Sequence, residues 1–102
     1  MYSRDIKYTK INDLVVPLDG NIAEEVELLN KKGYRTTTSC GGHMEHDICL
    51  IHIVFAKDYQ LQPPKFFKWN KNGIEFYLGQ SKPKRQEKYN LAMQEFKQWV
   101  IS

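Results

Sequence analysis

The sequence lacks several features that would place it in a class at once. Its 102 residues contain only two cysteines, Cys40 and Cys49. No apolar run approaches the roughly 20 residues that a membrane span requires, and residues 1–5 lack the apolar run of a signal peptide. These absences argue against a membrane protein and a disulfide-stabilised secreted scaffold. We therefore expect a cytoplasmic protein with reduced thiols.

Strong charge of either sign is also missing. Fifteen basic residues against twelve acidic ones leave a net charge of +3. That excess is too small to imply a nucleic acid partner. Hydrophobic residues make up 41% of the chain and aromatic residues 13%, which is enough to form a core. The length predicts one domain spanning residues 1–102.

Apolar periodicity predicts two helices. In residues 20–32, apolar residues recur at i, i+4 and i+7 to form one stripe: Ile22, Val26 and Leu29. Asn21 followed by Glu24 has the spacing of a capping box, and Gly33 is placed to end the helix. A second stripe predicts a final helix capped by Ser81, with Pro83 in its first turn. Its members are Tyr89, Ala92, Met93, Phe96, Trp99 and Val100.

Strands are predicted before, between and after these positions. Residues 1–18 read as one or two short strands ended by Pro17. Threonine-rich residues 34–39 form a strand with no strongly apolar face, so one face should line a polar space. Residues 48–55 are the most apolar run and predict a central strand covered on both faces.

The dipeptide Asn72-Gly73 is typical of a two-residue hairpin turn. That turn would pair Trp69 with Phe76 and Lys68 with Tyr77. The element order predicts an α+β fold in two layers, with a mixed, mostly antiparallel sheet of about four to five strands and two helices packed on one face.

The candidate functional site is the stretch that follows the threonine-rich strand. Its residues are Ser39, Cys40, Gly41, Gly42 and His43. Consecutive N–H groups in a glycine turn can bind an anion, and a histidine can add a hydrogen bond or a positive charge. Arg35, Ser39 and His52 are expected to line the same pocket. The alternative is a plain turn, in which the glycines serve only the backbone conformation.

Histidine and cysteine recur every three residues between Cys40 and His52, which suggests zinc. On a regular strand, however, Cys49 and His52 point to opposite faces, so Cys49 is interpreted as a buried apolar residue. The remaining metal alternative uses Cys40, His43 and His46, with His52 or Asp47 as the fourth ligand. A related alternative is a small hydrolase in which Cys40 acts with His43. The leading interpretation is not enzymatic and needs no cofactor.

A basic surface is predicted near the end of the chain. Seven basic side chains lie between residues 65 and 88: Lys65, Lys68, Lys71, Lys82, Lys84, Arg85 and Lys88. Such a surface suits an acidic protein or a phosphorylated ligand. A merely solvated cationic face is the alternative.

The motif Leu29-Asn30-Lys31-Lys32-Gly33-Tyr34, continued by Thr38-Ser39-Cys40-Gly41-Gly42-His43, resembles small uncharacterised proteins of phages and prophages of Gram-positive bacteria. The likeness extends to Pro63-Pro64-Lys65-Phe66 and Trp99. It implies a protein of the host bacterial cytoplasm that counters host defence. We expect a homo-oligomeric protein that sequesters a nucleotide-like signal. The alternative partner is a host defence protein, bound through the basic surface as an anti-CRISPR inhibitor would be.

Overall fold

The computed structural model describes residues 6–11, 13–42, 48–79 and 84–102. Strands β1 (Ile6–Ile11) and β2 (Leu14–Asp19) form an antiparallel ribbon, followed by helix α1 (Ala23–Lys31). The second sheet has the order β3-β4-β6-β5 and contains β3 (Thr36–Gly41), β4 (Cys49–Phe55), β5 (Lys68–Asn70) and β6 (Gly73–Leu78). Helix α2 (Arg85–Ile101) ends the chain.

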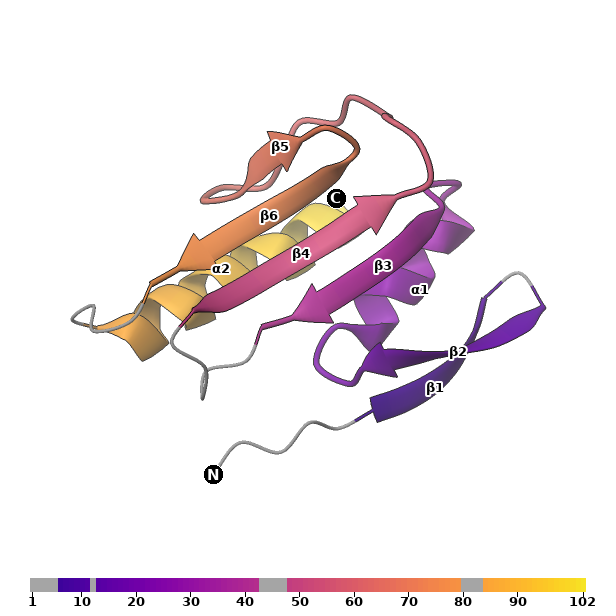
Figure 1. Ribbon diagram of the computed structural model, residues 1–102, viewed down its shortest axis with the longest axis horizontal. Helices are drawn as coiled ribbons and strands as arrows, with labels where there is room; N and C mark the ends of the chain where they lie inside the picture. Colours follow the sequence, from indigo (N-terminus) through magenta and orange to yellow (C-terminus); the bar gives the residue numbers. More distant parts are fainter. Residues whose placement is uncertain (1–5, 12, 43–47, 80–83) are drawn as a thin grey trace.

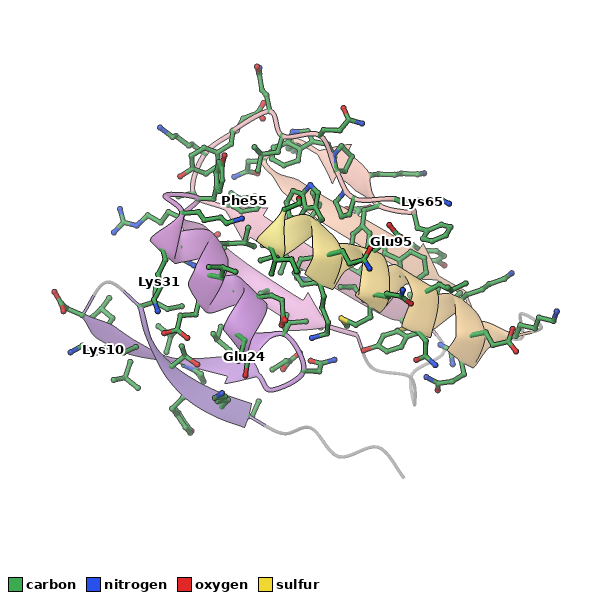
Figure 2. The ribbon with its side chains drawn as sticks, turned by 180° about the vertical axis from the view of Figure 1, so that it is seen from behind. Lys10, Glu24, Lys31, Phe55, Lys65 and Glu95 are labelled. Atoms are coloured by element: carbon green, nitrogen blue, oxygen red, sulfur yellow. The ribbon has the colours of Figure 1, made fainter. Side chains whose placement is uncertain are left out.

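Both helices lie on one side of the four-stranded sheet (Figure 1). Figure 2 shows this side from behind, with α1 and α2 in front of the strands and their side chains filling the layer between. The core is formed there by apolar residues of both layers, including Val26 of α1, Phe55 of β4 and Phe96 of α2. The predicted two-layer α+β fold is confirmed. Each strand pair among the described residues is antiparallel, and the first two strands form a separate ribbon.

The expectation that β4 is covered on both faces is wrong. Alternate residues face the helices and are fully buried: Cys49, Ile51, Ile53 and Phe55. The residues between them are only half-buried: Leu50, His52 and Val54. They belong to the face opposite the helices, called here the open face, over which Figure 1 shows no helix. The strand is apolar on both sides, but only one side is covered by the described part of the chain.

The start of α1 also differs from its prediction. The N-cap residue is Ile22, and no side chain caps the helix. Asn21 does not form the capping box because its side chain is bound elsewhere, to Gly41 and Tyr89. The predicted end is correct: Gly33 has φ of +99°, and the N–H of Tyr34 donates to the carbonyl of Leu29 at 2.9 Å.

The hairpin of β5 and β6 forms one residue earlier than predicted. Its turn residues are Lys71 and Asn72, and Trp69 pairs with Ile74 rather than with Phe76. The predicted pairing of Lys68 with Tyr77 is wrong for the same reason. Gly73 is the first residue of β6, where a Cβ would lie 2.5 Å from the carbonyl oxygen of Ile53. The glycine is therefore needed for close strand packing, and not at the turn.

The remaining boundaries shift by a few residues. Pro17 does not end its strand, since β2 continues to Asp19 and Pro17 pairs with Tyr8. Among the described strands, β2 pairs only with β1, so its other edge forms no ladder hydrogen bonds. A proline, which has no backbone N–H, is tolerated in such an edge strand. The apolar stripe of α2 is confirmed by the burial of Ala92, Met93, Phe96 and Val100. The predicted Ser81 cap and Pro83 lie outside the described residues.

Candidate functional site

A groove of about 420 Å³ separates the ribbon from the edge strand β3. Its ribbon wall is apolar and comprises Ile11, Leu14, Val16, Pro17 and Leu18. The other wall is polar and comprises Asn30, Arg35, Thr36, Thr37, Thr38 and Ser39. The volume lies in the range of about 300 to 1,000 Å³ that is typical of ligand pockets. The expectation that the threonine-rich strand lines a polar space agrees with this arrangement.

Arg35 is the one charged residue among the described residues that line the groove. Its backbone is held at both ends: the N–H donates to the hydroxyl of Tyr59 at 3.1 Å, and the carbonyl accepts from the N–H of Ala56 at 2.8 Å. The residue as a whole is exposed. An exposed arginine on a fixed backbone in the groove lining can bind an anion that enters the groove.

The backbone of Ser39 also faces the groove. The neighbouring Gly41 directs its N–H and C=O away from β4, towards residues that precede α1 and towards α2. Residues two apart in a strand direct these groups to the same side. Ser39 therefore presents its N–H and C=O at the outer edge of β3, next to its hydroxyl group.

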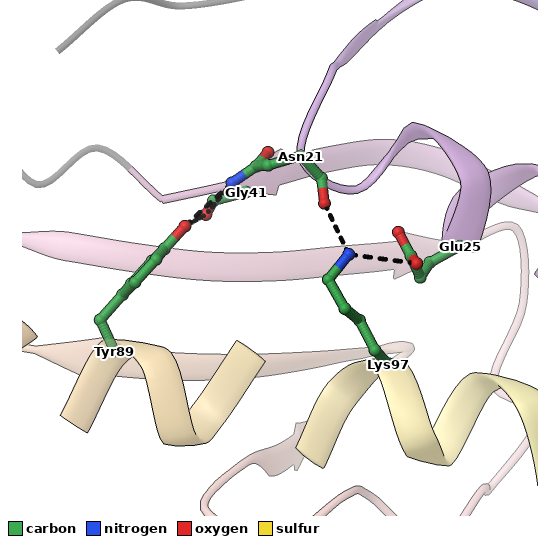
Figure 3. Close-up of polar contacts among 5 residues, drawn as sticks. All are labelled: Asn21, Glu25, Gly41, Tyr89 and Lys97. Atoms are coloured by element: carbon green, nitrogen blue, oxygen red, sulfur yellow. Dashed lines mark hydrogen bonds and ion pairs between the residues drawn. The ribbon is translucent and has the colours of Figure 1, made fainter. Parts of the chain in front are cut away.

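The far end of β3 is closed by a network around Gly41 (Figure 3). The Gly41 carbonyl accepts hydrogen bonds from Asn21 Nδ2 at 3.1 Å and from the Tyr89 hydroxyl at 2.6 Å. The Gly41 N–H donates to Asp19 Oδ2 at 2.9 Å. Lys97 of α2 extends the network, because its Nζ donates to the Asn21 carbonyl and pairs with Glu25 at 3.1 Å. β3 is thus joined to α2 and to the end of β2.

The two glycines of the motif have steric roles in this network. A Cβ on Gly41 would lie 2.1 Å from Asn21 Oδ1. Gly42 has φ of +89°, and a Cβ there would lie 2.9 Å from both Cys49 Sγ and Tyr89 Cε1. Both residues are buried. An anion that approached the Gly41 N–H would have to displace the Asp19 carboxylate. The close contacts of the two glycines explain why a larger residue does not fit at either position.

The predicted site residues thus divide into three groups. Arg35 and Ser39 line the groove, whereas Gly41 and Gly42 belong to the closed end. Cys40 and His52 are directly opposite each other in the register of β3 and β4, on the open face. His43 and His46 lie outside the described residues, so their binding roles stay a prediction.

His52 is half-buried, and burial lowers the pKa of its imidazole below the usual 6.5. The carboxylates of Glu75 and Asp19 act in the opposite direction and raise it by a smaller amount. His52 is therefore mostly neutral near pH 7, and it can accept a proton.

Parts of the groove and of the open face were not predicted from the sequence. The apolar wall provided by Leu14 and Val16 was not identified, because the approach of β2 to β3 is a tertiary contact. Glu75, which is opposite His52, was not identified either. The alternation of apolar and polar residues around Glu75 was a usable signal, but the one-residue error in the turn obscured its partner.

The metal and basic-surface alternatives involve residues both inside and outside the described ranges. Within the described ranges, no group of three or more histidine, cysteine, aspartate or glutamate side chains could hold a metal ion. Cys49 is fully buried on the helical face, as predicted.

The exposed members of the predicted basic surface in the described part of the chain are Lys65, Lys68, Lys71, Lys84 and Lys88. No helix in the described part is long and apolar enough to cross a membrane.

A second hollow, of about 450 Å³, lies at the C-terminal end of α2. Among the described residues of its lining, the charged side chain is that of Lys32. The Lys32 Nζ already donates to backbone oxygens of Val100 and Ser102. This hollow therefore offers less to an anionic ligand than the groove between β2 and β3.

Comparisons with protein-family models, with curated proteins and with solved structures give no match for this chain.

Proposed function

We propose that this protein binds a small phosphorylated, nucleotide-like ligand in the groove between β2 and β3, and that it releases the ligand chemically unchanged. The observation that carries the proposal is the division of the groove into an apolar wall and a hydroxyl-rich wall with one arginine. A nucleotide has a flat, weakly polar base and an anionic phosphate, which match these two walls.

The phosphate is assigned to the end of the groove near Arg35. Arginine binds phosphate through two parallel hydrogen bonds. The hydroxyl of Thr36 accepts a hydrogen bond from Asn30 at 3.0 Å, so its own hydrogen remains available to donate. Among the described residues that line the groove none is acidic, which favours an anionic ligand over a cationic one.

The base is assigned to the ribbon wall. Leu14 is 68% exposed although it lines the groove, so a bound ring would bury apolar surface that now faces solvent. The N–H and C=O of Ser39 face the same space and can form hydrogen bonds with the edge of a base. The likeness to phage proteins makes nucleotide signals of host defence the first ligands to test.

The test is a thermal shift panel of nucleoside phosphates and cyclic oligonucleotide signals. A ligand at a hundred times its Kd should stabilise the protein by about 2.7 kcal/mol, a shift of several degrees. Arg35→Ala should abolish most of the shift, whereas Lys88→Ala, an exposed position on α2, should retain it. Heat denaturation of the complex should return the ligand intact.

Three results would contradict the proposal. No shift with any ligand would argue against nucleotide binding. A shift lost in Lys88→Ala but retained in Arg35→Ala would place the site on the basic surface instead. Recovery of an altered ligand would show an enzyme rather than a binder.

A further inference from the structure

A row of chemically active side chains crosses the open face. The register places Cys40 of β3 opposite His52 of β4 and His52 opposite Glu75 of β6. Lys68 of β5 is opposite Glu75 and completes the row. Directly opposite side chains on one face have Cβ atoms about 4.5 to 5.5 Å apart. A thiol, an imidazole and a carboxylate are therefore neighbours, although they lie far apart in the sequence.

We propose that Cys40 is a reactive thiol that forms a mixed disulfide with a small disulfide molecule, with His52 as the acceptor of its proton. The Cys40 Sγ–H proton moves to the imidazole, and Sγ attacks one sulfur of the small disulfide. A new S–S bond forms as the old one breaks. The leaving thiolate then takes the proton from the imidazolium, so the reaction is balanced without any other reactant.

The surroundings of His52 suit this role. Its imidazole is mostly neutral near pH 7 because burial lowers its pKa. Glu75 on β6 and Asp19 on β2 are the carboxylates that would stabilise the imidazolium once it forms. Asn70 holds Glu75 through a hydrogen bond to Oε1 at 3.2 Å. A hollow of about 290 Å³ lies on the β6 side of His52, lined also by Val54 and Gly73, and Cys40 lies across His52 from it.

Disulfide exchange fits this site better than acyl transfer. Acyl transfer needs N–H donors for an oxyanion, commonly including the N–H after the nucleophile. Here that group is the Gly41 N–H, which donates to Asp19. Disulfide exchange forms no oxyanion. The other cysteine, Cys49, is fully buried on the helical face, so it cannot displace the attached group and the reaction stops at the mixed disulfide.

The experiment follows the reaction of the full reduced chain with 2-hydroxyethyl disulfide, an uncharged reagent, by mass spectrometry across neutral pH. We expect one adduct, on Cys40, which is lost in Cys40→Ser. His52→Gln should slow the reaction about tenfold near pH 7 and make its rate rise about tenfold per pH unit towards the usual thiol pKa of about 8.5. The wild-type rate should change much less over that range. Tyr77→Phe, on the same face, is the matched control and should react as the wild type does.

Equal rates and equal pH profiles for the wild type and His52→Gln would overturn the proposal. So would an adduct on Cys49 before Cys40, or no adduct at all. If His52→Gln does not fold, the wild-type profile decides. A wild-type rate that follows an ordinary thiol pKa would contradict a role for His52. The test is independent of the groove, so nucleotide binding can fail without affecting it.

Discussion

The two ends of β3 have different roles. At the end near Gly41, backbone groups and the space around them are occupied by Asp19, Asn21 and Tyr89. At the end near Arg35, strand and ribbon are separated by a groove. The glycine-rich motif that most suggests a ligand lies at the closed end. The comparison shows that glycines can be required by packing, while hydroxyl groups and an arginine nearby remain accessible to a ligand.

The largest effect is expected from Gly42→Ala at the closed end. Its positive φ costs about 1 kcal/mol for alanine, and the contacts of a Cβ with Cys49 and Tyr89 should add about 1 to 3 kcal/mol. Gly33→Ala is the matched control, since Gly33 also has positive φ but no atom within 4 Å of its Cβ position. Urea denaturation should therefore show the larger loss for Gly42→Ala. Equal losses would mean that backbone strain alone explains the glycine.

Tyr89→Phe should have the next largest effect. The change removes a hydroxyl that donates to the Gly41 carbonyl and accepts from Asn21. The expected loss of unfolding free energy is about 1 kcal/mol. The corresponding control is Tyr77→Phe, because Tyr77 is 61% exposed on the open face. A loss of equal size in both variants would show that the network around Gly41 adds no stability.

The smallest effect is expected from the protonation of His52. Because its pKa is lowered in the folded state, the unfolded chain binds the proton more readily. The contribution of neutral His52 to the free energy of unfolding is fully present above the pKa of the unfolded state, about 6.5. It is lost as pH falls through that value towards the lower folded pKa. When the pH is lowered from neutral to mildly acidic, the urea midpoint of unfolding should thus fall more in the wild type than in His52→Gln.

His52→Gln leaves every other titratable residue of the chain in place, so the difference between the two proteins isolates His52. An equal fall in the two midpoints would contradict the assignment of a lowered pKa to His52.

Elements with strong local signals could be predicted from the sequence. The period of Ile22, Val26 and Leu29 specifies α1, and alternation along β4 places Cys49 and His52 on opposite faces. These signals depend on neighbours in the sequence. They are also reinforced by burial, which is why they survive in the fold.

Features that depend on distant contacts could not be predicted in the same way. Asn21 has a capping-box spacing, but Gly41 and Tyr89 bind its side chain. Gly73 suits a turn, but the close approach of Ile53 requires it in the strand. The groove forms because β2 lies beside β3, and no local sequence pattern predicts how closely these two strands approach. Only Arg35 and Ser39 of its lining were predicted as ligand-binding residues.

The most direct test of the contrast between the two ends is the Kd of a nucleotide found in the panel, measured calorimetrically for Arg35→Ala and Tyr89→Phe. Arg35→Ala should weaken binding about tenfold or more, since it removes charge-assisted hydrogen bonds, and should leave stability unchanged. Tyr89→Phe should lower stability and leave Kd within about twofold of the wild type. A Kd that changes in Tyr89→Phe but not in Arg35→Ala would place the ligand at the closed end and contradict the account.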